Sequence, residues 1–448
     1  MEENAPELDQ PKKCVLILTS DAGYGHRSVA NALKAALDQK YGSQCETHIV
    51  NPLDDPRAPT FLRDSEDDYT RLVRNAPELY RLGYKVSDAE FPHTIIESVL
   101  TVSLYEVMGE LVRQHQPHVI VSTHTMYQPS LAAYFGLNKV YVPLIVVVPD
   151  LANVTRLWFE PDVDLFLVPS EAVKNIALKY GLKEEKLHIT GIPVSPKFAN
   201  NKRSKADIRA DLGWHPYLPT FLAAGSPRVN GLAETLNVLN HFGLPLQVAA
   251  TAGGDEGLLE ELKAIDWHIP AHLYGYVENM PEMMLASDAV ISKAGGLVVS
   301  ESLASGLPIL IIDVIPGQEE GNRDYVIEHG AGLVADNPIQ VLEALAHWMK
   351  DDGRGLRQAA EKARRIGRPT AALESADLIW QAAQQGAEAK LPLSELRRAR
   401  LIDLLTHNQI TWDKKPKTDK KKKADKKPKD VKKKKSNKPS NHKIGELE

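Results

Sequence analysis

Short runs of apolar residues alternate with longer amphipathic stretches along most of this chain. In its first half, apolar runs at residues 15–19, 118–123 and 140–148 each lead into a polar or glycine-containing loop. Continuous apolar runs of this length are typical of strands that are buried on both faces of a parallel sheet. Between Val29 and Leu37 the apolar residues recur instead with helical spacing. The pattern therefore predicts strands that alternate with helices, an α/β fold.

The stretch at residues 288–322 has the pattern of one complete βαβ unit. Apolar runs at residues 289–291 and 309–312 flank an apolar helix pattern. Gly295 and Gly296 lie where the first strand passes into the helix. Free backbone N–H groups and the helix dipole suit such a turn to a phosphate or pyrophosphate. Two glycines at a βα turn are also common without any ligand, so the motif alone leaves a purely structural interpretation open.

Polar side chains in the same stretch favour a binding site. Lys293 ends the first strand and would add a positive charge, and Glu301, one turn into the helix, would reach a ribose diol. The polar loop at residues 317–322 follows the next strand and should lie at the same carboxyl edge of the sheet, where open α/β sheets bind ligands. An acidic residue inside an apolar helix is a poor structural choice.

The chain opens with a strand, a glycine-containing loop and a helix. Gly23 and Gly25 precede His26 at the predicted helix start. The loop lacks the third glycine and the acidic ribose ligand of a dinucleotide-binding fingerprint. Near the positive end of a helix dipole His26 should stay neutral, which suits a general base. A surface-loop histidine without a catalytic role is the alternative that the local pattern leaves open.

Three further loops follow predicted strands and should lie at the carboxyl edges of the sheets. In the first half they contain His124 and Asp150, and in the second half Ser226 and Arg228 follow the apolar run at residues 221–224.

Composition narrows the class of protein. The 448 residues suffice for two domains, and the apolar and charged content is that of a soluble globular chain. Cys14 and Cys45 are too few for a disulfide framework, and no Cys/His cluster indicates zinc. The acidic N-terminal segment has no signal-peptide pattern, and the apolar runs are too short to span a membrane. We therefore expect a protein of the reducing cytoplasm.

The overall charge of −5 conceals an asymmetry. Residues 413–448 contain 16 Lys against 6 Asp and Glu, a net charge of about +10, so the rest of the chain carries about −15. This segment has too few apolar residues to fold, which predicts a disordered tail. It is either a solubilising tail or an electrostatic tether to an anionic membrane. Without interleaved aromatic residues it does not indicate a specific nucleic-acid partner.

The segment at residues 69–85 mixes tyrosines with arginines and a lysine in a mainly helical pattern. Such a stripe is typical of an ordinary amphipathic helix, but it also fits a helix at a membrane interface.

Residues 288–322 resemble the donor-sugar half of the MurG/monogalactosyldiacylglycerol synthase family of glycosyltransferases. The matching positions are Lys293, Ala294, Gly295, Glu301, Gly306, Pro308, Pro316, Gly317, Gln318, Glu319 and Asn322. Two departures from the family pattern are Gly296, where proline is usual, and Val298-Val299, where small and hydroxyl residues are usual.

The resemblance extends over about residues 14–385. Gly23, Gly25 and His26 match the family's GGxGH-type loop, whose histidine faces the acceptor. Asp150 and Trp158 persist, but the histidine that the family places between them is missing here.

In the second half the resemblance implies two further contacts. Ser226 and Arg228 stand at the family's phosphate loop, which is poor in glycine here, and Val277 lies in the segment whose backbone meets the uracil ring.

The resemblance implies a GT-B fold, in which two Rossmann-like domains face a central cleft. We expect an acceptor domain at residues 12–199, a donor domain at 211–386 whose last helix returns to the first domain, a helical extension at 387–412 and a disordered tail at 413–448. The residues that carry the resemblance therefore all precede the predicted tail.

The implied function is an inverting transfer of a hexose from a UDP-sugar to a lipid acceptor, such as diacylglycerol or a glycolipid. His26, supported by Asp150, would remove the acceptor proton, and Gln318, Glu319 and Asn322 would bind the sugar. Ser226, Arg228, Val277, Lys293, Gly295, Gly296 and Glu301 would bind the nucleotide and its phosphates without a metal or other cofactor. The expected partners are a UDP-hexose, a lipid acceptor and an anionic membrane surface at the cytoplasmic inner face, reached through residues 413–448 and 69–85.

Three alternatives share this pattern. They are a peptidoglycan-precursor N-acetylglucosamine transferase, a UDP-sugar epimerase of the same fold and a catalytically silent UDP-sugar-binding protein. The peptidoglycan-precursor transferase differs from a glycolipid synthase in its acceptor half. Lipid-dependent release of UDP would distinguish a glycolipid synthase from the epimerase and from the binding protein.

Overall fold

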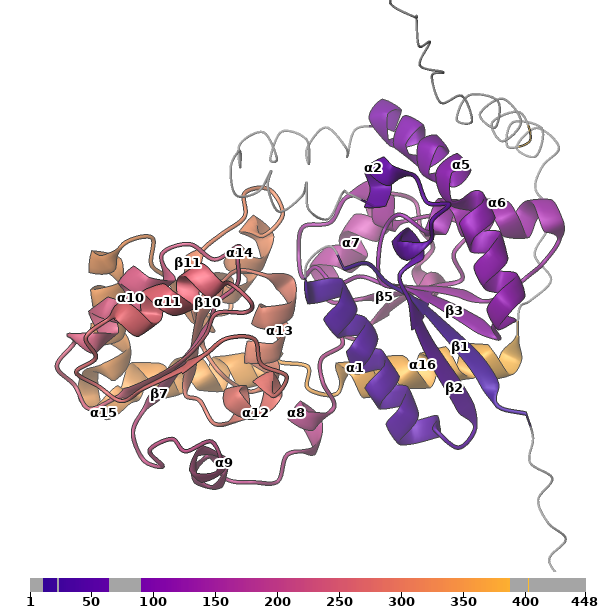
Figure 1. Cartoon of the computed structure of the whole chain (residues 1–448). Helices are drawn as coiled ribbons and strands as arrows, with labels where there is room; N and C mark the ends of the chain where they lie inside the picture. The colour runs from indigo at the N-terminus through magenta and orange to yellow at the C-terminus, as the bar shows by residue number, and fades with distance from the viewer. Residues whose placement is uncertain (1–10, 22–23, 64–89, 387–401, 403–448) are drawn as a thin grey trace, which may run out of the picture. The chain divides into compact units, whose positions relative to one another are not determined.

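The computed structural model describes residues 11–21, 24–63, 90–386 and 402. Two six-stranded sheets, both wholly parallel, account for the strands of this part of the chain. The first sheet has the strand order β2-β1-β3-β4-β5-β6 and the second the order β12-β11-β10-β7-β8-β9. Figure 1 shows helices on both faces of each sheet, which is the doubly wound arrangement that the alternating pattern predicts.

The strands of the first sheet are β1 (Lys13–Leu18), β2 (Cys45–Val50), β3 (Val119–Ser122), β4 (Leu144–Val147), β5 (Leu165–Val168) and β6 (Leu187–Ile189). Its main helices are α1 (Tyr24–Tyr41), α5 (Glu90–His115), α6 (Gln128–Asn138) and α7 (Glu171–Lys179), and α2 (Thr60–Arg63) is one turn. Short 3₁₀ turns lie at Pro52–Asp54, Arg156–Trp158 and Glu184–Lys186.

The strands of the second sheet are β7 (Thr220–Ala224), β8 (Gln247–Thr251), β9 (Ala271–Tyr274), β10 (Ala289–Lys293), β11 (Ile309–Asp313) and β12 (Gly332–Val334). Its helices are α10 (Leu232–Asn240), α11 (Glu256–Ala264), α12 (Met280–Leu285), α13 (Gly296–Ala304), α14 (Glu320–Glu328) and α15 (Pro338–Ile366). Two short helices, α8 (Lys197–Asn200) and α9 (Lys205–Asp211), lie between the sheets in the sequence, and α16 (Ala371–Gln385) follows α15.

Alternation of side chains along β1 builds two apolar layers on the first sheet. Val15 and Ile17 pack into one core cluster with residues of α1 and α16, whereas Leu16 and Leu18 pack into another with residues of α5 and α6. Because successive strand residues point to opposite faces, one strand serves both layers.

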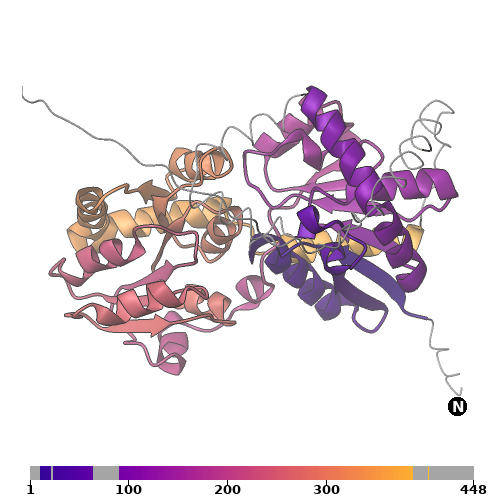
Figure 2. The same cartoon turned by 45° about the horizontal axis from the view of Figure 1, so that its top comes forward.

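Helix α16 returns to the first sheet, as expected for a GT-B fold. The ring of Trp380 stacks on Tyr41 of α1 with centroids 4.9 Å apart, and Asp377 accepts a hydrogen bond from the Tyr41 hydroxyl at 2.5 Å. In Figure 2 this helix, drawn in orange, passes behind α1 and the first sheet.

The strand pattern is confirmed with one correction. The run at residues 140–148 forms only the short strand β4, since Pro143 has no N–H to donate to a ladder. The predicted domain boundaries stay predictions, and residues 69–85, nearly all of 387–412 and all of 413–448 lie outside the described residues. None of the described helices is long and apolar enough to cross a bilayer.

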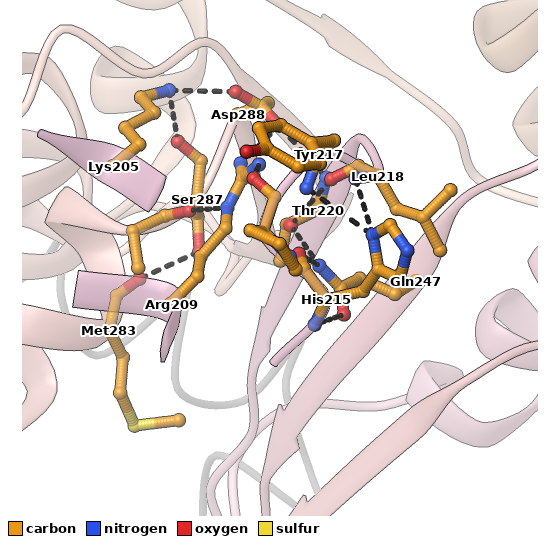
Figure 3. A network of polar contacts seen from close by, with 12 residues as sticks. Lys205, Arg209, His215, Tyr217, Leu218, Thr220, Gln247, Met283, Ser287 and Asp288 are labelled. Carbon is orange, nitrogen blue, oxygen red and sulfur yellow. Dashed lines mark hydrogen bonds and ion pairs between the residues drawn. The ribbon is translucent and has the colours of Figure 1, made fainter. Parts of the chain in front are cut away.

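A polar network attaches α9 to the second sheet (Figure 3). Asp288, just before β10, pairs with Lys205 at 2.8 Å and with Arg209 at 2.7 Å, and it accepts a hydrogen bond from the backbone N–H of Thr220. The network thereby joins the segment between the two halves to the start of β7 and β10.

Candidate active site

His26 lies in the first turn of α1, at the carboxyl edge of the first sheet. Its Nδ1–H donates to the carbonyl oxygen of Thr123, which follows β3, with an N···O distance of 2.6 Å. Because a carbonyl oxygen can only accept, this contact fixes the proton on Nδ1 and leaves the Nε2 lone pair for another partner. Burial is the main cause that lowers the pKa of His26; the Thr123 bond opposes it, the charge of Arg228 acts with it, and the net result is a pKa of about 4. His26 is therefore neutral at pH 7, and Arg228 of the second half lies close enough to act on it.

The glycines before His26 contribute differently. Gly23 lies outside the described residues. A Cβ built on Gly25 would meet no protein atom within 4 Å, so packing does not explain the glycine. Its predicted role toward the acceptor stays a prediction.

A second histidine lies beside His26. The rings of His26 and His124 are 4.7 Å apart in an edge-to-face arrangement, and Trp158 stacks on His26 at 6.2 Å. Burial, followed by the charge of His26, lowers the pKa of His124 well below 6.5. The sequence placed His124 at this edge but gave no reason to assign it a role, because only the fold brings it against His26.

Lys293 and Glu319 form an ion pair where the phosphate and sugar groups of a donor are predicted to bind. Glu319 is only 3% exposed, and its other carboxylate oxygen accepts a hydrogen bond from the backbone N–H of Ile315 at 3.0 Å. Gly295 is the N-cap of α13 and offers no side chain to its first turn, so the helix N-terminus keeps backbone donors for a ligand.

Asp150 lies against this pair. Burial and, second to it, the negative charge of Glu319 raise the pKa of Asp150, while a hydrogen bond from Gln318 and the charge of Lys293 oppose the rise; the net result is a pKa of about 7. The structure therefore places Asp150 with the donor loop of the second half. Its predicted support of His26 stays a prediction.

The loop that carries Asp150 packs closely on the glycines of the second half. A Cβ on Gly296 would lie 2.6 Å from the carbonyl oxygen of Pro149, and one on Gly321 would lie 2.6 Å from Oδ1 of Asn153. This explains why glycine stands at position 296, where the family pattern has proline.

Asn322 joins the two halves directly. It is fully buried, its Oδ1 accepts from the backbone N–H of Leu151 at 3.1 Å, and its Nδ2–H donates to the carbonyl oxygen of Ala294 at 3.0 Å. Both ends of the side chain are thus engaged by the backbone, so its predicted contact with sugar requires these bonds to be shared or exchanged.

The carboxyl group of Glu301, on α13, lies in a low-dielectric environment. Burial raises its pKa to about 8. A carboxyl group in such surroundings is poised for a hydrogen-bonding partner, as expected of a ribose ligand.

The remaining nucleotide-binding candidates lie in loops at the carboxyl ends of β7 and β9. The Ser226 hydroxyl accepts a hydrogen bond from the backbone N–H of Arg228 at 3.3 Å, and Val277 packs against the core between β9 and α12. Their contacts with a nucleotide stay predictions. In the described part of the chain no three His, Cys, Asp or Glu side chains converge as metal ligands would.

The structure thus brings the sequence candidates into two groups. His26, His124 and Trp158 lie at the edge of the first sheet; Asp150, Lys293, Gln318 and Glu319 lie where the Asp150 loop meets the second half. A neutral imidazole with one available lone pair suits proton removal, and a lysine beside a helix N-terminus suits a phosphate.

Two family models match the chain. One, described as monogalactosyldiacylglycerol (MGDG) synthase, matches residues 26–194; the other, described as glycosyl transferases group 1, matches residues 252–367. A probable monogalactosyldiacylglycerol synthase, chloroplastic, from Nicotiana tabacum is 32% identical over 380 residues, which cover 82% of this chain and 70% of the relative.

Two solved structures match nearly the whole architecture. MurG of Acinetobacter baumannii has a TM-score of 0.54 at 14% identity and covers 83% of this chain and 100% of its own. The UDP-GlcNAc 2-epimerase of Neisseria meningitidis, bound to UDP-GlcNAc, has a TM-score of 0.54 at 13% identity and covers 84% of this chain and 100% of its own. At this identity the two structures show the GT-B fold, and they do not select among the enzymes that share it.

Proposed function

This chain belongs to the monogalactosyldiacylglycerol synthase family of glycosyltransferases, and we propose that it transfers a galactosyl group from UDP-galactose to the hydroxyl group of diacylglycerol. It is a UDP-sugar-dependent hexosyltransferase with a nucleotide-sugar donor and a lipid acceptor. One observation carries the mechanism: a neutral His26 with its Nε2 lone pair available, close to Arg228 of the other half.

His26 is the general base. Its Nε2 accepts the proton of the acceptor hydroxyl while that oxygen attacks the anomeric carbon of the sugar. The new C–O bond forms as the bond between the anomeric carbon and the UDP oxygen breaks on the opposite face, so the configuration inverts. The Thr123 carbonyl holds the imidazole in the required tautomer.

The departing UDP gains negative charge, and positive groups of the second half stabilise it. We infer that Lys293 leaves its ion pair with Glu319 and binds the diphosphate. The diphosphate also accepts hydrogen bonds from the first turn of α13, beyond Gly295 and Gly296, and contacts Arg228 and Ser226. Glu319, released from the lysine, then accepts hydrogen bonds from the sugar hydroxyls together with Gln318. The uracil lies along the backbone at Val277, and Glu301 accepts from the ribose.

These charges make a metal unnecessary, and we expect EDTA to leave the initial rate unchanged. A loss of rate that Mg²⁺ or Mn²⁺ restores would show that the leaving group needs more charge than Lys293, Arg228 and the helix provide.

We further propose that the enzyme works as a peripheral protein on an anionic membrane surface at the cytoplasmic face. The lysines of residues 413–448 would contribute the electrostatic attraction, on the order of 1 kcal/mol for each lysine near the surface, and residues 69–85 the interfacial contact. Co-sedimentation with vesicles that contain anionic lipid, lost at high salt and in a chain that ends at residue 412, is the expected result. Equal binding to neutral vesicles would contradict it.

The decisive test is release of UDP from UDP-galactose and from UDP-glucose, with and without diacylglycerol in vesicles. Lipid-dependent release that prefers UDP-galactose is expected from the intact chain. His26→Ala should lower the rate by about 10³-fold, the size of a general-base contribution. His188→Ala, an exposed histidine on β6, is the matched control and should keep full activity.

Other results would assign one of the alternatives. Release of UDP and free sugar that is indifferent to lipid would favour an epimerase, and release only with a peptidoglycan precursor would favour a MurG-like transferase. No release with any donor and lipid would leave a binding protein.

A further inference from the structure

His26 and His124 present opposite hydrogen-bonding groups. On His26 the proton is on Nδ1, because the Thr123 carbonyl accepts it, and Nε2 carries the lone pair. On His124 the backbone N–H of Met126 donates to Nδ1 at 3.4 Å, so this ring, if neutral, carries its proton on Nε2. Two neighbouring imidazoles therefore offer one acceptor and one donor.

Hydrogen bonds anchor the backbone around His124. The Ser122 hydroxyl donates to the carbonyl oxygen of His124 at 2.8 Å, and the Thr123 hydroxyl bonds to Thr19 at 3.0 Å. His124 is 7% exposed, so only a small part of the residue can meet a ligand. A donor of this kind, fixed and nearly desolvated, loses little entropy when it binds an oxygen.

The same segment holds a second neutral polar group. Gln128, the first residue of α6, is fully buried, and neither its Oε1 nor its Nε2 meets a hydrogen-bond partner in the part of the chain that the structure describes. A buried carboxamide without partners is costly to keep, which points to a ligand or water that completes it. The Tyr127 side chain does not cap the helix, so its first turn also retains backbone donors.

The His124 ring, the Gln128 carboxamide and the backbone N–H groups of the α6 N-terminus are all uncharged donors. Such donors suit an uncharged oxygen atom. A phosphate or carboxylate is normally met by arginine, lysine or a metal. Diacylglycerol carries two ester carbonyl oxygens close to its free hydroxyl group. The His26 and His124 rings are 4.7 Å apart between centroids, a separation that the hydroxyl and a neighbouring ester group of one glycerol unit can span.

We propose that His124 is a specificity-determining residue that donates its Nε2–H to an ester carbonyl oxygen of the acceptor lipid, beside the hydroxyl group that His26 deprotonates. The proposal deepens the proposed function and rests on it. It makes the ester linkage, and not only the hydroxyl group, a recognised part of the acceptor.

The test compares 1,2-diacylglycerol with the 1,2-dialkylglycerol of equal chain length, which has ether oxygens and no carbonyl groups. Both are presented in the same vesicles with UDP-galactose. His124→Phe keeps a ring of similar size and removes the donor, whereas His124→Gln returns an N–H donor near the former Nε2. His188→Phe is the matched control for a histidine-to-phenylalanine change outside the site.

The intact enzyme should prefer the diester by about tenfold in kcat/KM for the acceptor, the ratio expected of one well-placed hydrogen bond. His124→Phe should reduce this preference to about one through a loss on the diester alone, and His124→Gln should recover part of it. The KM for UDP-galactose should stay unchanged in both variants, and His188→Phe should behave as the wild type.

Equal use of diester and diether by the intact enzyme would overturn the proposal, as would a preference that His124→Phe retains. Direct binding separates this failure from that of the proposed function. Short-chain 1,2-dihexanoylglycerol and its dihexyl ether, titrated into the protein in a thermal-shift measurement, report recognition even without transfer. A His124-dependent preference for the ester in binding supports the inference, and its absence contradicts it.

Discussion

Asn322, in the second half of the chain, accepts a hydrogen bond from the backbone N–H of Leu151, in the first half, at 3.1 Å. The other end of the same side chain donates to the carbonyl oxygen of Ala294, directly after β10. A single carboxamide therefore ties the loop that carries Asp150 to the turn before α13. This residue and the close approach of Gly296 to Pro149 hold the carboxyl edges of the two sheets together.

Replacing Asn322 with leucine tests this relationship. Leucine has a similar volume but leaves the Leu151 N–H and the Ala294 carbonyl buried without partners. We expect the free energy of unfolding to fall by about 2–4 kcal/mol, because each unsatisfied group costs about 1–3 kcal/mol. Urea unfolding followed by circular dichroism measures the change. Asn237→Leu, on the exposed side of α10, should stay within about 0.5 kcal/mol of the wild type. Unchanged stability of Asn322→Leu together with a raised KM for the donor would instead make Asn322 a sugar ligand alone.

Local patterns were enough to predict the α/β class and to place most candidates in loops after strands, whereas Glu301 lies within α13 and Asn322 within α14. The sequence pattern predicts the βαβ unit at residues 288–322 and the strand before His26, because burial on both faces gives continuous apolar runs. The sequence did not predict which residues these side chains contact. His26 meets Thr123 97 positions later, and Asn322 meets Leu151 171 positions earlier. Such contacts depend on how the sheets bring distant strand ends together, and nothing in the local sequence encodes them.

The pKa of His26 sets the acid side of the pH profile. Since burial and Arg228 lower it to about 4, the imidazole stays unprotonated and active down to that pH. We expect kcat/KM for the acceptor to lose activity through His26 protonation only near pH 4, and not near 6.5. Removing the positive charge with Arg228→Gln should raise the pKa of His26 and move the acid side of the profile upward. The pH dependence of kcat/KM, measured with short-chain diacylglycerol in mixed micelles, gives both the wild-type midpoint and its shift in Arg228→Gln. A wild-type midpoint near 6.5 would show that His26 is solvated in the working enzyme.

Glu301 links donor binding to stability. Burial raises its pKa to about 8 from 4.5, so the unfolded chain loses this proton at lower pH than the folded chain does. The folded state is therefore progressively disfavoured as the pH rises from about 4.5 through about 8. Glu301→Gln should remove this penalty and raise the Tm relative to the wild type at pH 8, with little difference at pH 4.5. Above pH 8, where Glu301 is ionised, the same change should raise the KM for UDP-galactose roughly tenfold, because a carboxylate bonds ribose hydroxyls more strongly than an amide does. Calorimetry at the two pH values and donor kinetics give both numbers. A Tm difference that does not depend on pH would contradict the assignment.

Asp288 holds the network of Figure 3 together, and its loss should be among the most destabilising single changes. Arg209 is only 5% exposed, and it donates both to Asp288 and to the carbonyl oxygen of Ala286. Burial alone would raise the pKa of Asp288, but Lys205, Arg209 and the Thr220 N–H outweigh it and lower the pKa below 3.8. Asp288→Asn leaves the buried guanidinium without its counter-charge and should cost about 3–5 kcal/mol.

The matched control is Asp211→Asn, which breaks the exposed pair of Asp211 with Arg203 and should cost under about 1 kcal/mol. Because the pKa of Asp288 is depressed, its stabilisation is present above pH 3.8 and is lost as the pH falls further. The unfolding free energies of wild type and Asp288→Asn, measured in urea, should therefore differ most near neutral pH and converge in acid. Equal costs for the two substitutions at pH 7 would show that Arg209 finds another partner, and that the network does not depend on Asp288.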